Sequence, residues 1–203
     1  MNASQPVNGV RSLLASLNCD GRFGFALLTA CALLLVPELA GDEGRILLRY
    51  DRAGLAAGQW WRLLTAHIVH LDLGHAALNS LGLILMWALF ARDYQPRQWL
   101  SIVLVTILAI DAGLWFCDST ISWYVGSSGA LHGVMAAGTL AHLRRRDPDG
   151  WILAAFILVK LGYEHWVGAL PFSNSGEGVV VEAHLYGALG GLAIAAGFKP
   201  KSV

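Results

Sequence analysis

The chain has 203 residues, of which 56% are hydrophobic and only 14% are charged, and its mean hydropathy is +0.54. This composition excludes a soluble globule, which needs more polar surface, and predicts one integral membrane domain. The net charge of zero, without any basic stripe, argues against nucleic acid as a partner. The cysteines are odd in number and widely separated, so we expect no disulfide framework: Cys19, Cys31 and Cys117.

Six apolar stretches are long enough to cross a bilayer, which requires about 20 mostly apolar residues. In chain order they are residues 23–40, 73–91, 98–116, 127–143, 151–170 and 181–198. They predict an all-α membrane protein with a six-helix domain over residues 23–198 and short tails at 1–22 and 199–203. A cleaved signal peptide is the alternative for the first stretch, but Glu38 occupies a position that needs a small residue, so a retained helix is favoured.

Basic residues at the ends of these stretches predict the orientation. A cytoplasmic N-terminus places nine of the 14 basic residues on the cytoplasmic side, namely Arg11, Arg22, Arg92, Arg97, Arg144, Arg145, Arg146, Lys199 and Lys201. The long connection from Gly41 to Ala66 then lies outside, where Trp60 and Trp61 suit an interfacial structure. An even number of spans returns the C-terminus to the cytoplasm.

Polar residues that are useful in catalysis recur at one depth in three of the stretches. His75, Asn79, Ser128 and His184 each stand roughly 13 to 17 residues before the basic residue that ends the stretch. At about 1.5 Å per helical residue, all four lie roughly 20 to 25 Å from one membrane face. Polar groups inside a bilayer are costly and tend to be functional, so this coincidence predicts a site.

The run from Gly126 to Gly129, Gly-Ser-Ser-Gly, opens the fourth stretch. Free backbone N–H groups and the positive end of the helix dipole there suit an oxyanion. Ser128 is the candidate nucleophile, and His184 is the base at the right depth. His75 and Asn79 share a helix face, and both can donate hydrogen bonds to a developing oxyanion.

Small residues at four-residue spacing predict close packing of the fourth and sixth helices, because Gly129 and Gly133 match Gly187 and Gly191. Each signal alone has a plainer interpretation. A serine at a helix start is usually a cap, a membrane histidine is usually a packing residue, and a glycine pair usually marks a helix contact. Only their joint occurrence at one depth favours catalysis.

Taken together, these residues resemble the rhomboid family of intramembrane serine proteases over about residues 23–198. The matching motifs are Trp61-Arg62, His70, His75, Asn79, Gly126-Ser127-Ser128-Gly129 and Ala183-His184-Leu185-Tyr186-Gly187 followed by Gly191. The resemblance implies a six-helix bundle in which Ser128 is the nucleophile and His184 the general base and acid, without an acidic third member and without a cofactor. It also implies an oxyanion hole of His75, Asn79 and the Ser128 backbone N–H.

The same resemblance implies a bacterial inner-membrane protein whose active site opens to the periplasm through a water-filled cavity, with the fifth helix as a lateral gate. One position departs from the family pattern, because His132 stands where rhomboids commonly carry a tyrosine that packs on the catalytic histidine. Packing by the imidazole and a proton-sharing role are both open, so His132 and His70 are accessory candidates.

The Gly-Ser-Ser-Gly run, His132 and the short chain are most similar to the rhombosortase subgroup. That subgroup processes surface proteins with a C-terminal Gly-Gly motif, a single transmembrane helix and a basic tail. The expected partners are therefore the bilayer and membrane-anchored proteins with a C-terminal transmembrane helix. A general rhomboid protease for other single-span substrates is the alternative.

Charged residues inside the spans need an explanation of their own. Lys160 and Glu164 stand one turn apart on the fifth stretch, where they could neutralise each other as an ion pair. The alternative is that they contact substrate at the gate. Asp111 on the third stretch could pair with a neighbouring helix.

Two other classes of function remain. The run His67, His70, Asp72 and His75 is rich in metal-ligand types, which would suit a membrane metalloenzyme or metal transporter. It lacks the HExxH pattern, and we predict no metal site. An inactive rhomboid that binds client helices without cutting them is also conceivable, although every residue that the chemistry requires is present.

Overall fold

The computed structural model describes residues 24–170 and 179–201, so the predicted tail at 1–22 lies outside the described residues. A helix stands at each of the six predicted stretches. In chain order these helices are α2 (Gly24–Leu35), α6 (Leu73–Phe90), α7 (Pro96–Phe116), α8 (Ser128–Arg145), α9 (Pro148–Val167) and α10 (Glu182–Ala196). The structure therefore confirms the predicted positions of the helices.

The first helix extends further than the sequence predicts. After α2 the chain continues through the 3-10 helix η1 (Val36–Ala40), in which Pro37 is near the start, and then through α3 (Gly41–Leu48). Polar residues 42 and 43 end the apolar pattern in the sequence, although the helical path does not end there. The connection between α3 and α6 is completed by β1 (Tyr50–Asp51), α4 (Arg52–Ala56) and α5 (Arg62–Thr65).

Within the described residues, three helical segments have the length and apolar composition of a membrane span: Gly24–Leu48, Leu73–Phe90 and Pro96–Phe116. The other three helices are shorter or more polar, since α10 has 15 residues and α8 ends in Arg144 and Arg145. Two of these three helices, α8 and α10, also carry Ser128 and His184. Six spans therefore remain a prediction, whereas the helical fold, with three helices suited to span a membrane, is shown.

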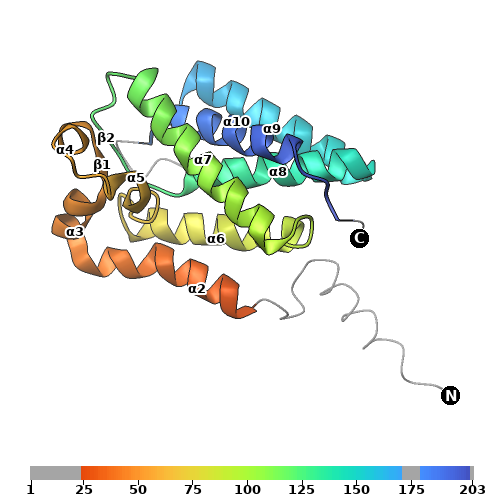
Figure 1. Cartoon of the computed structure of the whole chain (residues 1–203), viewed down its shortest axis with the longest axis horizontal. Helices are drawn as coiled ribbons and strands as arrows, with labels where there is room; N and C mark the ends of the chain where they lie inside the picture. Colours follow the sequence, from red (N-terminus) through yellow and green to blue (C-terminus); the bar gives the residue numbers. More distant parts are fainter. Residues whose placement is uncertain (1–23, 171–178, 202–203) are drawn as a thin grey trace.

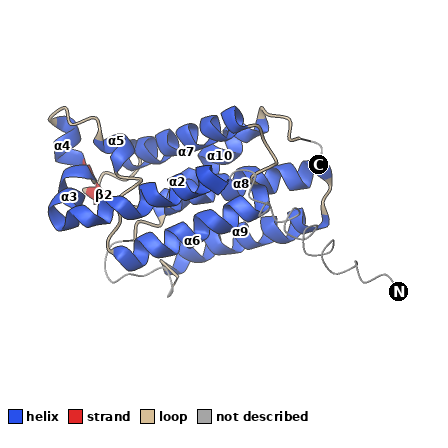
Figure 2. Cartoon of the chain, turned by 90° about the horizontal axis from the view of Figure 1, so that it is seen from below, coloured by secondary structure: helices blue, strands red, loops and turns tan. Residues whose placement is uncertain are grey.

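The long helices run side by side, with α8 inside the bundle (Figures 1 and 2). α8 packs against α6, α7, α9 and most extensively α10, while α10 also packs on α7 and α2 covers α6. The glycines and alanines of α8 explain its central place, because small side chains permit neighbours on several sides. This arrangement encloses the beginning of α8, where Ser128 stands.

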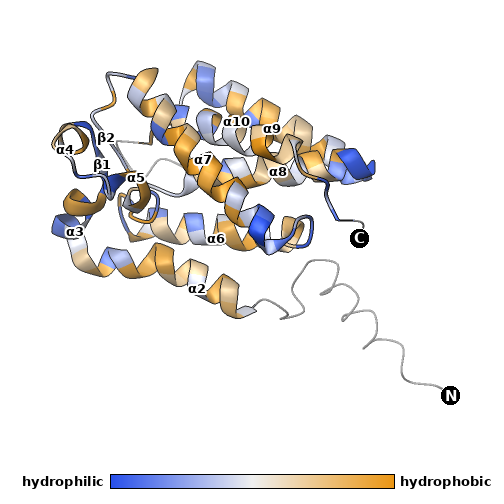
Figure 3. Cartoon of the chain, viewed as in Figure 1, coloured by the Kyte–Doolittle hydropathy of each residue, from blue (hydrophilic) through white to orange (hydrophobic). Residues whose placement is uncertain are grey.

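Apolar residues cover the sides of the helices and polar residues gather at the two ends of the bundle (Figure 3). On α9, for example, Trp151, Leu158 and Trp166 are 73%, 70% and 84% exposed, which suits contact with lipid. At the end where α8 terminates, the Arg144 guanidinium donates to the carbonyl oxygens of Ala195, Ala196 and Phe198 and so caps α10.

Candidate active site

The segment before Ser128 is held by its hydrogen bonds to the connection between α3 and α6. Its strand β2 (Trp123–Tyr124) pairs antiparallel with β1, and Tyr50 lies opposite Tyr124. The Tyr124 hydroxyl donates to the Gly126 carbonyl oxygen at 2.6 Å, and burial raises the pKa of Tyr124, which keeps this donor protonated. Gly126 has φ 119°, a conformation that side chains rarely permit, and its N–H donates to the Ala66 carbonyl at 2.9 Å. The chain therefore enters α8 in a fixed direction.

Ser128 and His184 meet at the beginnings of two helices. The Ser128 Oγ lies 2.8 Å from His184 Nε2, and the two residues belong to the first turns of α8 and α10. A methyl group on Gly187 would collide with the Gly129 carbonyl oxygen, and one on Gly191 would collide with the Gly133 carbonyl. The predicted close packing of these helices is confirmed, and it brings the serine to its histidine.

An acidic neighbour of His184 contradicts the expectation of a histidine without one. Glu164 of α9 lies with its Oε2 2.9 Å from His184 Nδ1, and both side chains are only 2% exposed. A carboxylate oxygen only accepts, so Nδ1 carries the proton and Nε2 is left to accept from the Ser128 hydroxyl. The sequence showed Glu164 at the right depth, but depth alone does not give the direction in which a helix presents its side chains.

The predicted ion pair between Lys160 and Glu164 is present, with the Lys160 ammonium 2.5 Å from Glu164 Oε1. Each oxygen of the carboxylate therefore has its own partner. The pair neutralises two charges in a buried place, where a single charge would be costly. Of these two gate candidates, Lys160 lines the cavity beside Ser128 and Glu164 does not.

His132 packs on the catalytic candidate His184. The two imidazole rings are stacked, with centroids 4.2 Å apart and planes inclined by 15°. The His132 Nδ1 donates to the Ser128 carbonyl oxygen at 2.7 Å, because that oxygen can only accept. None of the described residues forms a hydrogen bond with the buried His132 Nε2. The geometry is that of a packing residue, and a proton-sharing role stays a prediction.

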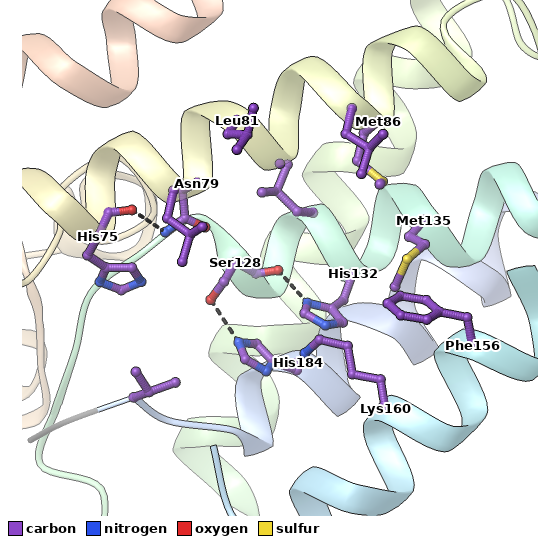
Figure 4. Close-up of a pocket in the computed structure, with 15 residues that line it drawn as sticks. His75, Asn79, Leu81, Met86, Ser128, His132, Met135, Phe156, Lys160 and His184 are labelled. Carbon is purple, nitrogen blue, oxygen red and sulfur yellow. Dashed lines mark hydrogen bonds between the residues drawn. The ribbon is translucent and has the colours of Figure 1, made fainter. Parts of the chain in front are cut away.

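A cavity of about 330 Å³ opens beside Ser128 between α6, α8 and α9. Its polar lining comes from His75, Asn79, Ser128, His132, Lys160 and His184, and its wall is otherwise mostly apolar. Figure 4 shows the side chains of His75, Asn79 and Ser128 around a common space. The Asn79 amide already donates one hydrogen to the His75 carbonyl oxygen at 3.0 Å, which leaves its second hydrogen for another acceptor.

His70 supports the site from outside the cavity. Its Nε2 lies 3.2 Å from Ser127 Oγ, and its backbone N–H donates to the Glu38 carboxylate at 2.9 Å. Burial, reinforced by the nearby His75, lowers the pKa of His70 to about 3, so this imidazole stays neutral. His70 therefore contacts Ser127, the residue next to Ser128, and not Ser128 itself.

The potential metal ligands on either side of His70 contact separate partners. His67 lies 3.3 Å from Asp111, which identifies the partner of that buried acid, and Asp72 accepts from the His75 backbone N–H at 2.7 Å. The described residues do bring one atom each of His132, Glu164 and His184 within 4.8 Å of one another. Glu164 and His184 are, however, already joined to each other by a hydrogen bond.

The sequence of this chain is similar to those of known proteins. A family model described as "Rhomboid domain" matches residues 57–201. The chain belongs to the rhomboid family. This rhomboid is 25% identical over 138 residues to "Putative rhomboid protease YdcA" of Bacillus subtilis (strain 168), a match that covers 68% of the chain and 67% of that protein. It is 29% identical over 146 residues to "Rhomboid protease GluP" of the same organism, across 70% of the chain but only 27% of GluP.

Family membership and the apolar helices together make this rhomboid an integral membrane protein and an intramembrane serine protease. Rhomboid proteases act on membrane protein substrates within the bilayer. The matched region begins before α6 and includes Ser128, Glu164 and His184.

Proposed function

We propose that this rhomboid hydrolyses a peptide bond at or near the periplasmic end of a transmembrane helix, with Ser128 as the nucleophile and His184 as the general base and acid. The observation that carries the proposal is the distance of 2.8 Å between Ser128 Oγ and His184 Nε2 at the wall of a cavity. A hydroxyl is a weak nucleophile until a base accepts its proton, and a contact at this distance permits that transfer.

In the proposed reaction the Ser128 Oγ attacks the scissile carbonyl carbon while its proton moves to His184 Nε2. The carbonyl oxygen becomes an oxyanion, which accepts from the Ser128 backbone N–H, His75 and the remaining amide hydrogen of Asn79. Collapse breaks the C–N bond, and the leaving amine takes the proton from Nε2. Water then attacks the acyl-enzyme through the same histidine, and no cofactor is needed.

We also propose six spans with both termini in the cytoplasm of a bacterium, so that the site in its inner membrane opens to the periplasm. The support is the basic end of the bundle, which holds Arg144, Arg145 and Lys201, opposite the end at which α8 begins with Ser128. The cavity between α6 and α9 suits lateral entry of a substrate helix, and Lys160 on its wall is the candidate gate contact.

The proposed substrates are membrane-anchored proteins with a C-terminal Gly-Gly motif, a single transmembrane helix and a basic tail, as for rhombosortases. Support comes from the Gly-Ser-Ser-Gly run and from His132, which stacks on His184 in place of the usual tyrosine. A general rhomboid protease for other single-span proteins is the second candidate, because the apolar wall of the cavity itself selects no particular sequence.

A reporter assay separates these candidates. A substrate with the Gly-Gly motif and a generic rhomboid substrate are incubated in chelator with wild type, Ser128→Ala, His184→Ala and the neighbouring control Ser127→Ala. We expect the first two variants to abolish cleavage of the Gly-Gly reporter and the control to retain it. Cleavage of only the generic reporter would remove the sorting role, and cleavage that survives Ser128→Ala would remove the proposed nucleophile.

A further inference from the structure

We infer that Glu164 is a positioning residue for His184, so that hydrolysis depends on a linked Ser128, His184 and Glu164 instead of on the serine and histidine alone. This inference rests on the proposed function. Its structural basis is the contact between Glu164 Oε2 and His184 Nδ1 at 2.9 Å, on the side of the imidazole opposite to Ser128.

The carboxylate is fixed in place and shielded from solvent. Its second oxygen receives the Lys160 ammonium at 2.5 Å, and Glu164 is 2% exposed. α9 packs chiefly on α8 and touches α10 little, so the bond from Glu164 to His184 is a specific link between helices that otherwise barely meet. A residue needed only to neutralise Lys160 would not have to reach across to another helix.

This placement has two chemical consequences. Before reaction, Glu164 holds the proton of His184 on Nδ1 and leaves Nε2 free to accept the serine proton. During reaction, Nε2 takes that proton and the imidazole becomes a cation between Ser128 and the carboxylate. Glu164 stays ionised throughout and stabilises this cation, while the Nε2 proton later passes to the leaving amine. In a site shielded from water such stabilisation is strong.

The titratable groups around His184 are few. α8 contributes His132, which stacks on the ring, α9 contributes Glu164 and Lys160, and α6 contributes His75. The buried acid of α7, Asp111, pairs with His67 instead. Among the described residues that bond to His184, Glu164 is the acidic one, and its other partner is Lys160, so a test of Glu164 must also vary Lys160.

The decisive experiment compares Glu164→Gln, Glu164→Asp and the double variant Lys160→Met/Glu164→Gln with wild type on one cleavable reporter. In Glu164→Gln the amide oxygen turns to the charged Lys160, and its NH2 group faces His184. That arrangement favours the tautomer with the proton on Nε2, which cannot accept from Ser128. We expect kcat to fall at least 100-fold with KM within about twofold, because Glu164 does not line the cavity.

The double variant gives a readout that a merely structural role would not. Without the lysine, the amide oxygen is free to accept from His184 Nδ1, so kcat should recover about tenfold or more over Glu164→Gln. Glu164→Asp should also retain more activity than Glu164→Gln, since it keeps the charge. In Glu164→Gln and in the double variant, the acid limb of the kcat/KM profile should move to lower pH. The reason is that the carboxylate that favours the protonated imidazole has been removed.

The outcomes keep the two proposals apart. If Ser128→Ala and His184→Ala abolish cleavage but Glu164→Gln keeps the kcat and pH profile of wild type, the role of Glu164 is rejected and the proposed function stands. If Ser128→Ala still cleaves, the proposed function itself fails. The double variant has nearly the same volume and no buried charge, so it tests the inference even where Glu164→Gln does not fold. If the acid limb of the double variant is unchanged from wild type, the inference about Glu164 is rejected.

Discussion

His184 has a neighbour on each of its three functional surfaces. Nε2 meets Ser128, Nδ1 meets Glu164, and one face of the ring is covered by His132. An imidazole held in this way cannot rotate without breaking two hydrogen bonds and a ring contact. In the proposed reaction, the geometry needed for proton transfer is therefore present before substrate arrives, which would lower the cost of reaching the transition state.

Replacement of His132 separates its ring contact from its hydrogen bond. His132→Phe keeps the stacked ring and loses the bond to the Ser128 carbonyl oxygen, whereas His132→Ala loses both. A ring contact of this kind contributes about 0.5 to 1.5 kcal/mol, so we expect the alanine variant to lose roughly tenfold in kcat and the phenylalanine variant about threefold or less. Equal losses in the two variants would instead assign the effect to the imidazole nitrogens.

His70 should make the stability of the protein depend on pH. Its pKa in the folded protein is lowered to about 3, mainly by burial, while in the unfolded chain it is near the ordinary 6.5. The unfolded state therefore binds an extra proton as the pH falls below about 6.5, and folding stability decreases by at most about 1.4 kcal/mol per pH unit until the pH approaches 3.

Thermal unfolding in detergent between pH 7.5 and 4.5 measures this effect. The melting temperature of wild type should fall more steeply toward acid than that of His70→Gln, which keeps a donor for Ser127 and does not titrate. The comparison uses the slopes of melting temperature against pH and not the absolute stabilities, because replacement of a buried residue lowers stability at every pH. Parallel slopes would contradict a neutral His70.

At the scale of elements, the contact of α8 with α10 places Ser128, the proposed nucleophile, beside His184, its proposed base. The backbones touch where Gly187 meets Gly129 and where Gly191 meets Gly133. α9 contributes differently, since it packs chiefly on α8 and meets α10 at few positions, one of which is the hydrogen bond between Glu164 and His184. Two helices therefore determine the distance from serine to histidine, and a third supplies the charge behind the histidine.

Gly187→Ala should separate the two helices. The added methyl group meets the Gly129 backbone carbonyl, which cannot move aside as a flexible side chain could, and overpacking of this kind costs about 1 to 3 kcal/mol. We expect a lower melting temperature and at least a tenfold loss of cleavage. The matched control is Gly162→Ala on α9, where no atom lies within 4 Å of the new methyl group. A Gly187→Ala variant as active as the control would exclude this contact as the determinant of the site.

The helices themselves could be predicted because long apolar runs admit few alternatives in a membrane protein. The meeting of Ser128 with His184 could be predicted from depth and from glycine spacing. The contacts of Glu164 with His184 and of Asp111 with His67 could not, because they depend on the rotation of each helix about its axis. The continuation of the first helix through η1 into α3 was also missed, since residues 41–44 contain two glycines and two acids.

For the whole molecule, the distribution of charge predicts the orientation in the bilayer. Exposed Ser119 follows α7 at the end of the bundle opposite to Lys201, which is exposed near the C-terminus. With the native cysteines replaced, Ser119→Cys should react with a membrane-impermeant maleimide on intact spheroplasts. Lys201→Cys should react only after permeabilisation. Labelling of both positions from the same side would reject the proposed topology.

The link from α9 to His184 differs mechanically from the glycine contact. Closely packed backbones resist compression, so the contact that sets the distance from serine to histidine has little room to adjust. The carboxylate of Glu164, by contrast, belongs to a helix with few other ties to α10. In the proposed mechanism, displacement of α9 by a substrate helix would weaken His184 as a base while leaving Ser128 beside it, and cleavage would follow only after α9 had returned.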